Sequence, residues 1–414
     1  MAYFAGKMRM ARHRRERPQR PLALGGHLPA RAARLSHTED HLFSFIDRTR
    51  ELAEQDGAAP VPLGVGDCDL PTPPHIVEAM RQAVRDPSTH RYPPYAGTQA
   101  MREAAAGHLG RRFGLRPDPD TEVLATLGSK EAMAHLTMAY AEPGDVVLVP
   151  DPAYPVYGTW ARFCGAEVVR VPLRESNGFL PNLAAIPAGT ARRAKLFWVC
   201  YPNNPTAALA TSDFYAELAR FALRHDIVIA SDAAYSEIYY DCAPPPSFLQ
   251  APGAMECGIE FHSLSKAYNM PGWRVGFAAG NSDVVGALRA VKTHTDSGTF
   301  TAIQHAAVAA LNDTTGYPET LRSVYRDRMH LLCDGLEQAG LHVLRPKATF
   351  YCLVRCPRGM DSAGFAKKLL EDAHVLAIPG HGFGPGGEGY VRLTVCAGTE
   401  PIREAIRRIT AVHW

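Results

Sequence analysis

Short apolar runs alternate with amphipathic segments between about residues 120 and 280. The runs at 146–149, 196–199 and 227–230 are rich in Val, Ile, Leu and aromatic residues and predict buried strands. Between the last two runs, apolar residues recur at helical spacing from 214 to 221. Wholly apolar strands that alternate with amphipathic helices are typical of a mostly parallel sheet covered by helices. This part of the chain therefore predicts an α/β fold.

After about residue 312 the pattern becomes α+β. The elements that we expect there are, in order, a long helix through residues 325 and 331, a strand at 350–354, a helix around 365–369, strands at 375–378 and 390–395, and a closing helix with Pro401 near its first turn. The glycine-rich segment 380–387 superficially resembles a phosphate-binding loop, but it leads into a strand. No helix dipole is then available for an anion, and we interpret the segment as a turn.

The amino-acid composition narrows the kind of protein this can be, but it does not identify a function. Hydrophobic content of 46% and charged content of 21% are ordinary for an enzyme, and the net charge of +2 gives no argument for nucleic-acid or membrane binding. No apolar run approaches the roughly 20 residues that a membrane span requires. The nine cysteines are odd in number, scattered and without a CxxC pair, which favours free thiols in a reducing cytoplasm.

The first 37 residues are basic. They hold nine Lys or Arg against one acid, Glu16, with Pro, Ala and Gly between them. No apolar region follows Arg14 and Arg15, so a secretory signal is not expected. A basic arm that binds nucleic acid is one interpretation. We favour a disordered extension or a start codon placed too early.

The segment 263–277 combines serines, a lysine and an arginine in a pattern suited to an aldehyde cofactor that bears a phosphate. The Lys266 amine can form a Schiff base with an aldehyde. Ser263 and Ser265 precede the lysine and Arg274 follows it, so hydroxyls and a guanidinium are available to a phosphate dianion. The alternative is a surface lysine in a serine-rich turn, which the Gly-Trp-Arg-Val-Gly-Phe sequence at 272–277 disfavours.

A second phosphate-binding candidate lies at the start of a predicted helix. Ser129 and Lys130 follow the apolar run 123–127 and open an amphipathic segment. Their backbone amides would be exposed at the helix N-terminus, which attracts anions. Taken by itself, Ser129 is better explained as a simple N-cap.

Further polar and aromatic residues follow other predicted strands, where open α/β sheets bind ligands. Tyr154 could stack on a flat ring, although a lone tyrosine also fits a core or rim position. Asn204 could donate to a phenolate oxygen. Asp232 and Tyr235 supply a carboxylate and a phenol three residues apart, and a carboxylate beside a pyridine nitrogen keeps the ring protonated as an electron sink. Arg392 could hold a substrate carboxylate with two parallel hydrogen bonds.

These motifs, in this order, resemble the fold type I pyridoxal-phosphate (PLP) enzymes and in particular the class I/II aminotransferases. The likeness covers nearly the whole chain from about residue 40. It implies a large domain with a mostly parallel seven-stranded sheet sandwiched by helices, and a smaller α+β C-terminal domain. The implied boundaries are an extension at 1–37, an arm joining the small domain at 38–65, the PLP-binding domain at 66–312 and the small domain at 313–414.

The resemblance also implies a role for each candidate residue. Lys266 binds the cofactor and then moves the substrate proton, and Asp232 holds the pyridinium nitrogen. Tyr235 and Asn204 bind the ring oxygen, Asn204 also lies beside the substrate, and Tyr154 stacks on the ring. The residues implied to hold the phosphate are Ser129, Lys130, Ser263, Ser265 and Arg274.

Three further roles concern the substrate and a second subunit. Arg392 takes the substrate α-carboxylate, and Gly66 lines the pocket opposite it. Tyr92 matches the family tyrosine that reaches the phosphate of the neighbouring subunit. The resemblance therefore implies a homodimer with shared active sites, acting on a small amino acid and a 2-oxo acid.

Segment 291–300 with Gln304, and segment 41–43, look like those of LL-diaminopimelate aminotransferases and their relatives. Three pocket positions depart from that subgroup: His41 replaces an expected Tyr, His294 an expected Asn, and Tyr95 an expected Glu that would bind the distal ammonium. A buried ammonium without an acidic partner costs several kcal/mol. We therefore expect that diaminopimelate is not the substrate.

Three other functions fit part of the pattern. The same scaffold supports decarboxylases, lyases, cyclases and oxidases, but Arg392 and the proton-returning Lys266 favour transamination. Ser263 and Lys266 also spell the SxxK motif of serine acyl enzymes, whose downstream SDN and KTG motifs are missing. A transcription regulator with an aminotransferase-like sensor would need a helix-turn-helix module, which the short basic extension does not supply.

Overall fold

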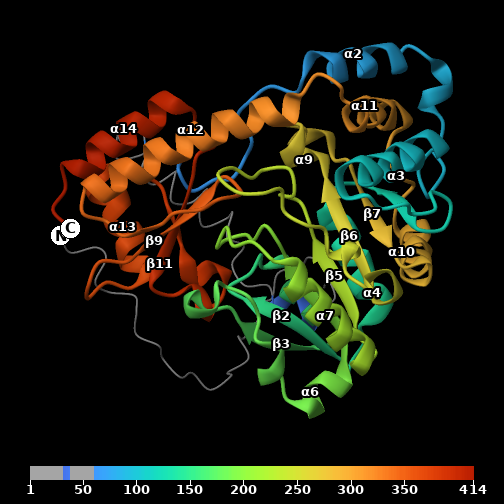
Figure 1. Ribbon diagram of the computed structural model, residues 1–414, viewed down its shortest axis with the longest axis horizontal. Helices are drawn as coiled ribbons and strands as arrows, with labels where there is room; N and C mark the ends of the chain where they lie inside the picture. Colours follow the sequence, from blue (N-terminus) through green and yellow to red (C-terminus); the bar gives the residue numbers. More distant parts are fainter. Residues whose placement is uncertain (1–30, 38–59) are drawn as a thin grey trace, which may run out of the picture.

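The computed structural model describes residues 31–37 and 60–414 (Figure 1). In Figure 1 the large sheet occupies one half of the molecule and a smaller sheet the other. The seven strands of the large sheet are β1 (Val123–Thr126), β2 (Val146–Asp151), β3 (Glu167–Pro172), β4 (Ala194–Cys200), β5 (Val228–Asp232), β6 (Gly258–Ser263) and β7 (Gly276–Gly280). Their order is β1-β7-β6-β5-β4-β2-β3.

The large sheet is parallel from β3 to β6, and β7 runs antiparallel to both of its neighbours. The residues of β1 and β2 are buried throughout, because helices cover both faces of the sheet. On one face the core includes apolar side chains from α4 (Ser129–Tyr140), α5 (Val156–Phe163) and α10 (Ser282–Thr295). On the other face it includes those of α2 (Pro74–Ala83), α3 (Gln99–Phe113), α7 (Ser212–His225) and α11 (Thr301–Leu311). The α/β architecture expected from the alternating pattern is confirmed.

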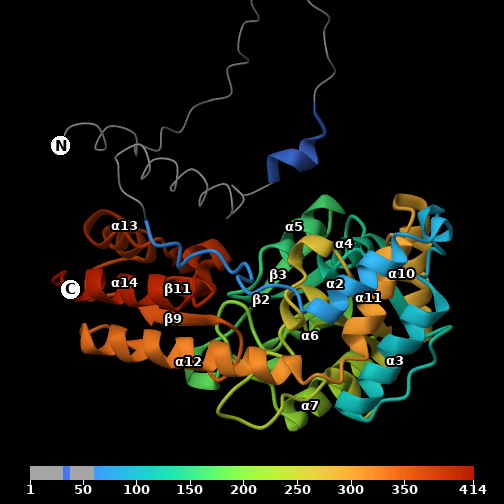
Figure 2. The ribbon, with the colours of Figure 1, turned by 90° about the horizontal axis from the view of Figure 1, so that it is seen from above.

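The smaller sheet is antiparallel, with the order β10-β11-β9-β8. Its strands are β8 (Val343–Leu344), β9 (Tyr351–Arg355), β10 (Ile378–Pro379) and β11 (Tyr390–Thr394). Apolar faces of α12 (Tyr317–Gln338), α13 (Ser362–Ala373) and α14 (Thr399–Thr410) contribute to its separate core. Figure 2 shows α12 running from this sheet toward α11, so a long helix links the two halves.

One predicted strand is shorter than expected. Of the run 375–378, only Ile378 belongs to β10. Val375 instead forms a parallel bridge with Val61, and the Leu376 amide donates to the Val61 carbonyl (2.9 Å). The incoming N-terminal segment therefore takes the backbone groups that β11 would have paired, a long-range contact with no local signal in the sequence.

The glycine-rich turn at 380–387 consists of two 3-10 helices, η7 (Gly380–Phe383) and η8 (Pro385–Gly387). A Cβ on Gly386 would lie 2.6 Å from the Asp151 carbonyl oxygen, so glycine allows this turn to lie against the end of β2.

Parts of the predicted N-terminal segments lie outside the described residues. Of the extension at 1–37, residues 31–37 are described, and η1 (Ala33–His37) contacts α5. His41 and most of the arm at 38–65 lie outside them. The boundaries at 65 and 312 remain predictions. No helix in 31–37 or 60–414 is both long and apolar enough to cross a membrane.

Candidate active site

A cavity of about 260 Å³ lies at the carboxyl ends of the large-sheet strands, facing the small sheet. Residues that follow β1, β2, β4, β5 and β6 contribute to its wall, because these strands end at the same edge of the sheet. Tyr351 on β9 and Arg392 on β11 approach from the small sheet. The predicted site residues that line the cavity are Gly66, Ser129, Lys130, Tyr154, Asn204, Asp232, Tyr235, Ser263, Ser265, Lys266, Arg274 and Arg392.

Lys266 lies on the one-turn helix α9 (Leu264–Ala267) directly after β6. The side chain of Ser263 caps this turn by accepting a hydrogen bond from the Ser265 amide (3.3 Å). Lys266 Nζ donates to the carbonyl oxygen of Gly66 (3.0 Å) and lies 5.4 Å from the centre of the Phe350 ring. The amine is therefore held at the cavity wall by the N-terminal segment and by a ring from the core of the small sheet.

Asp232 is the last residue of β5 and is 4% exposed. Its Oδ2 accepts a hydrogen bond from Tyr157 Oη (2.6 Å), and its Oδ1 accepts one from the Ala234 amide (3.1 Å). Burial raises the pKa of Asp232 to about 6, and these two hydrogen bonds oppose the rise. The carboxyl group is therefore mostly ionised at neutral pH and suited to a protonated ring nitrogen.

Tyr157 is a site residue that the sequence did not reveal. It lies on α5, three residues after Tyr154, and its ring stacks on Trp198 with a centroid distance of 4.9 Å and an interplanar angle of 6°. Burial holds the pKa of Tyr157 well above its usual range, so its hydroxyl remains a donor to Asp232. The available signal was the i,i+3 spacing of two tyrosines after a strand, which is common in ordinary cores.

Ser129 and Lys130 open α4, and Arg274 faces them across the cavity wall. Gly128 has a φ of +76°, and a Cβ at that position would lie 2.4 Å from Arg274 Nη2. Glycine is therefore needed for the guanidinium to approach the turn. Burial, and then the nearby charge of Arg274, lowers the pKa of Lys130. Two cations beside a helix N-terminus form a site that an anion would stabilise.

Arg392 is 5% exposed and is fixed by three kinds of contact. Nη1 donates to Asn204 Oδ1 (2.8 Å), Nη2 donates to the Gly64 carbonyl (2.9 Å), and the guanidinium lies 3.9 Å from the centre of the Tyr351 ring. Its Nε is buried and has no hydrogen-bond partner within the described chain. Arg392 nevertheless lines the cavity, where its guanidinium can pair with a substrate carboxylate.

Tyr351 is a second residue that the sequence did not single out. Its hydroxyl lies 3.2 Å from that of Tyr235, and a Cβ on Gly66 would lie 2.0 Å from Tyr351 Oη. Only glycine at position 66 therefore leaves room for this phenol. Because Asn204 Oδ1 accepts from Arg392, the amide nitrogen of Asn204 is the group left to donate to a cofactor oxygen.

Among the predicted site residues that the structure describes, two do not line this cavity. Tyr92 is 88% exposed, and His294 is exposed near the end of α10. Position 298 lies against the Tyr92 loop, since a Cβ on Gly298 would be 3.2 Å from Pro93 Cγ. The predicted contact of Tyr92 with a second subunit remains a prediction, as does any substrate contact of His294.

The donor set fits PLP. An amine, a mostly ionised buried carboxylate, an aromatic ring and a cationic turn line one cavity, as that cofactor's aldehyde, ring nitrogen, ring face and phosphate require. Arg392 in the same wall adds a cation for a carboxylate.

Comparisons with known proteins agree with this geometry. The family model described as aminotransferase class I and II matches residues 59–409. LL-diaminopimelate aminotransferase of Aquifex aeolicus is 47% identical over 91% of this chain and 97% of its own length. The enzyme of the same name from Syntrophobacter fumaroxidans is 46% identical over 93% and 99%.

Solved structures match over similar lengths. A substrate-bound BacF structure from Bacillus subtilis has a TM-score of 0.89 and 37% identity, covering 92% of this chain and 98% of the other. A probable N-succinyldiaminopimelate aminotransferase from Thermus thermophilus has a TM-score of 0.84 and 36% identity, covering 89% and 99%. The family match and the extent of these likenesses show that this chain belongs to the class I and II aminotransferases.

Proposed function

We propose that this enzyme uses PLP to move an amino group between an L-amino acid and a 2-oxo acid. The observation that carries the proposal is the convergence of Lys266, Asp232 and the cationic turn of Ser129, Lys130 and Arg274 on one cavity. Arg392 at the same cavity supports an amino acid or oxo acid, each of which has a carboxylate, as the second ligand.

Bound PLP would supply an aldehyde for the lysine and an electron-withdrawing ring for the electrons released from the substrate. Arg392 would orient the substrate through its carboxylate, with Tyr351 beneath the guanidinium. Lys266 Nζ is positioned by the Gly66 carbonyl. It would take the proton from the substrate α-carbon and deliver it to the cofactor carbon that had formed the aldehyde. Asp232, kept ionised by Tyr157, would hold the ring nitrogen in its protonated form.

We also propose that two copies assemble and share their sites. Tyr92 and Tyr95 are large aromatic residues exposed by 88% and 46%. Such side chains on one loop favour a covered surface over free contact with water. Light scattering of the purified protein should give twice the chain mass, and Tyr92→Ala should weaken PLP binding.

For the substrate, the supporting evidence points in two directions. The two relatives from Aquifex aeolicus and Syntrophobacter fumaroxidans are LL-diaminopimelate aminotransferases and favour that substrate. We nevertheless propose that diaminopimelate is not the preferred donor. Among the described residues that line the cavity, Asp232 is the one carboxylate, and it is committed to Tyr157 and the ring-nitrogen position. A distal ammonium would have no acidic partner from this part of the chain.

A panel of amino donors and 2-oxo acid acceptors tests the proposed reaction and the proposed substrate preference. Transamination predicts that a donor converts the bound cofactor to its amine form and that a 2-oxo acid reverses the change. Decarboxylation, elimination or oxidation would instead release carbon dioxide, ammonia or peroxide. Lys266→Ala should lose the conversion, whereas Lys347→Ala, an exposed lysine of the small domain, should keep it. Diaminopimelate giving the highest kcat/KM would refute the substrate proposal alone.

A further inference from the structure

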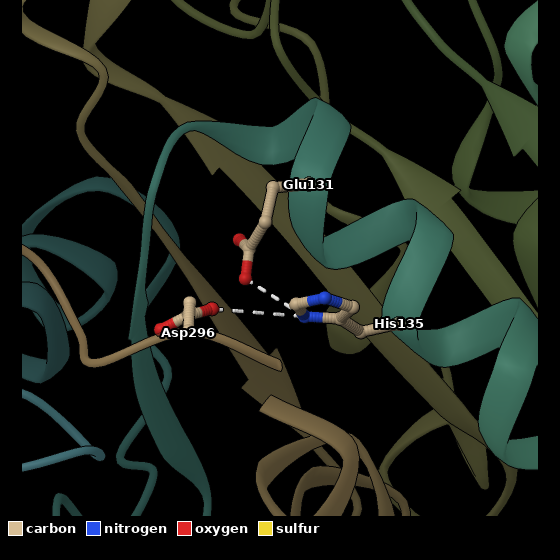
Figure 3. A group of neighbouring side chains, drawn as sticks. All are labelled: Glu131, His135 and Asp296. Carbon is tan, nitrogen blue, oxygen red and sulfur yellow. Dashed lines mark ion pairs between the residues drawn. The ribbon is translucent and has the colours of Figure 1, made fainter. Parts of the chain in front are cut away.

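Behind the cationic turn lies a compact group of charged side chains that the proposed chemistry does not use. Glu131 and His135 project from α4, and Figure 3 shows Asp296 approaching them from the end of α10. His135 Nδ1 lies 2.8 Å from Glu131 Oε1 and 3.9 Å from Asp296 Oδ2. His135 Nε2 is 2.8 Å from Thr295 Oγ1.

These three side chains are of the kinds that bind metal ions, and their ligand atoms lie close together. The cation between them, however, is an ammonium. Lys292 Nζ lies 3.2 Å from Glu131 Oε1 and 2.9 Å from each Asp296 carboxylate oxygen. The Lys292 side chain is 1% exposed, so its charge is balanced almost entirely by these two acids.

This group is joined directly to the cationic turn. Glu131 follows Ser129 and Lys130 in the first turn of α4, and its Oε2 accepts a hydrogen bond from the Leu127 amide (3.2 Å). The Leu127 carbonyl in turn accepts from Arg274 Nη2 (3.5 Å). The backbone that would hold the phosphate is therefore fixed from behind by Glu131.

At its other end, the group is fixed through Asp296 to the segment that follows α10. Asp296 Oδ1 accepts a hydrogen bond from the Gly298 amide (2.7 Å), and Thr299 Oγ1 donates to the Thr126 carbonyl (3.3 Å). Gly298 packs against Pro93, next to the exposed Tyr92. Lys292 thus lies between the cationic turn and the Tyr92 loop, which we propose meets a second copy.

Charge explains why a buried lysine is needed here. A carboxylate in the first turn of a helix stabilises the helix itself but repels a phosphate dianion at the same N-terminus. Glu131 and Asp296 contribute two negative charges and Lys292 one positive charge, so these three side chains together have a formal net charge of −1. Without Lys292 the net charge would be −2, in a partly buried setting where solvent screens it poorly.

We propose that Lys292 is a positioning residue for the cofactor phosphate, acting through Glu131 and Asp296 on the turn that contains Ser129 and Lys130. The inference rests on the proposed function, because it assumes that the anion at this turn belongs to PLP. Lys292 itself does not line the cavity.

The test compares two ligands that differ in the phosphate. PLP and pyridoxal share the aldehyde and ring, and their dissociation constants are measured by absorbance on wild-type apo-protein and on Lys292→Met. The expected result is about tenfold weaker binding of PLP, equivalent to about 1.4 kcal/mol, with less than a twofold change for pyridoxal. Equal losses for both ligands would indicate general damage and overturn the proposal, as would no loss for either. Lys195→Met, at an exposed position on β4, is the matched control.

A second pair of variants tests the charge argument. Lys292→Met combined with Asp296→Asn restores the net charge of −1 and keeps an acceptor for the Gly298 amide, so PLP affinity should return to within about threefold of wild type. A double variant as weak as Lys292→Met would contradict the argument. If Lys292→Met does not fold, Asp296→Asn alone carries the test, because it should strengthen PLP binding relative to pyridoxal, and weakening would overturn the proposal. Wild-type protein that binds neither ligand would instead refute the proposed function.

Discussion

Replacing Tyr157 by Phe removes one hydroxyl and leaves the ring that stacks on Trp198. The lost hydrogen bond, 2.6 Å long and donated to the Asp232 carboxylate, is of a kind worth roughly 1.5–3 kcal/mol. At 1.36 kcal/mol per unit, that loss corresponds to a rise of about 1–2 units in the pKa of Asp232. From about 6 in the wild type, the pKa in the variant would be about 7–8.

The direction of the pH dependence follows from which protonation state of Asp232 binds the cofactor. The protonated ring nitrogen needs the ionised carboxylate, so affinity for PLP falls as the pH drops through the pKa of Asp232. At pH 7 the ionised fraction falls from about nine-tenths to between about half and a tenth, which predicts two- to tenfold weaker binding by Tyr157→Phe. At pH 9 the two proteins should agree within about twofold.

The assay is a series of PLP titrations of apo-protein from pH 5 to 9, followed by absorbance. Tyr215→Phe is the matched control, because Tyr215 is equally buried but belongs to the core on the other face of the sheet. The midpoint of the acid limb should move upward in Tyr157→Phe alone. An unchanged midpoint, or an equal loss at every pH, would refute the role assigned to Tyr157.

Three further changes give separate outcomes. Arg392→Lys loses the planar pair of donors and should raise KM for both substrates by about 100-fold, with an unchanged cofactor spectrum; equal loss of PLP would contradict this. Gly128→Ala places a Cβ 2.4 Å from Arg274 Nη2 and should weaken PLP binding by at least about tenfold. The control is Gly286→Ala, within α10 and with open space around it. It should leave PLP binding unchanged and stabilise the fold by about 1 kcal/mol. In urea unfolding of apo-protein at pH 7, Asp232→Asn should be more stable than wild type by up to about 3 kcal/mol, because burial disfavours the charged carboxylate and raises its pKa. This advantage should disappear below about pH 4, where the wild-type carboxyl group is protonated in both the folded and the unfolded state. A stability difference that stays constant with pH would refute this explanation.

The site residues that the sequence predicted share a simple physical origin. Ser129, Tyr154, Asn204 and Asp232 each follow or end a buried strand, and the carboxyl ends of parallel strands meet at one edge of the sheet. Local pattern was therefore enough to bring them together. Lys266 was recognisable because the residues around it belong to one continuous motif.

The residues that the sequence did not reveal depend on contacts between distant segments. Tyr351 reaches the cavity because β9 of the small sheet faces the large one, and Lys292 matters because α10 packs beside α4. The local sequence does not distinguish Tyr157 from the other buried residues of α5. In the same way, β10 is short because Val61 arrives from elsewhere in the chain to pair with Val375.

The central claim is a covalent bond between Lys266 Nζ and the cofactor. Purified protein incubated with PLP, reduced with borohydride and digested should give one modified peptide, with the added mass on Lys266. Lys130 lines the same cavity and provides an internal comparison, since it should remain unmodified. Modification of Lys130 in place of Lys266, or no trapped cofactor at all, would contradict the account.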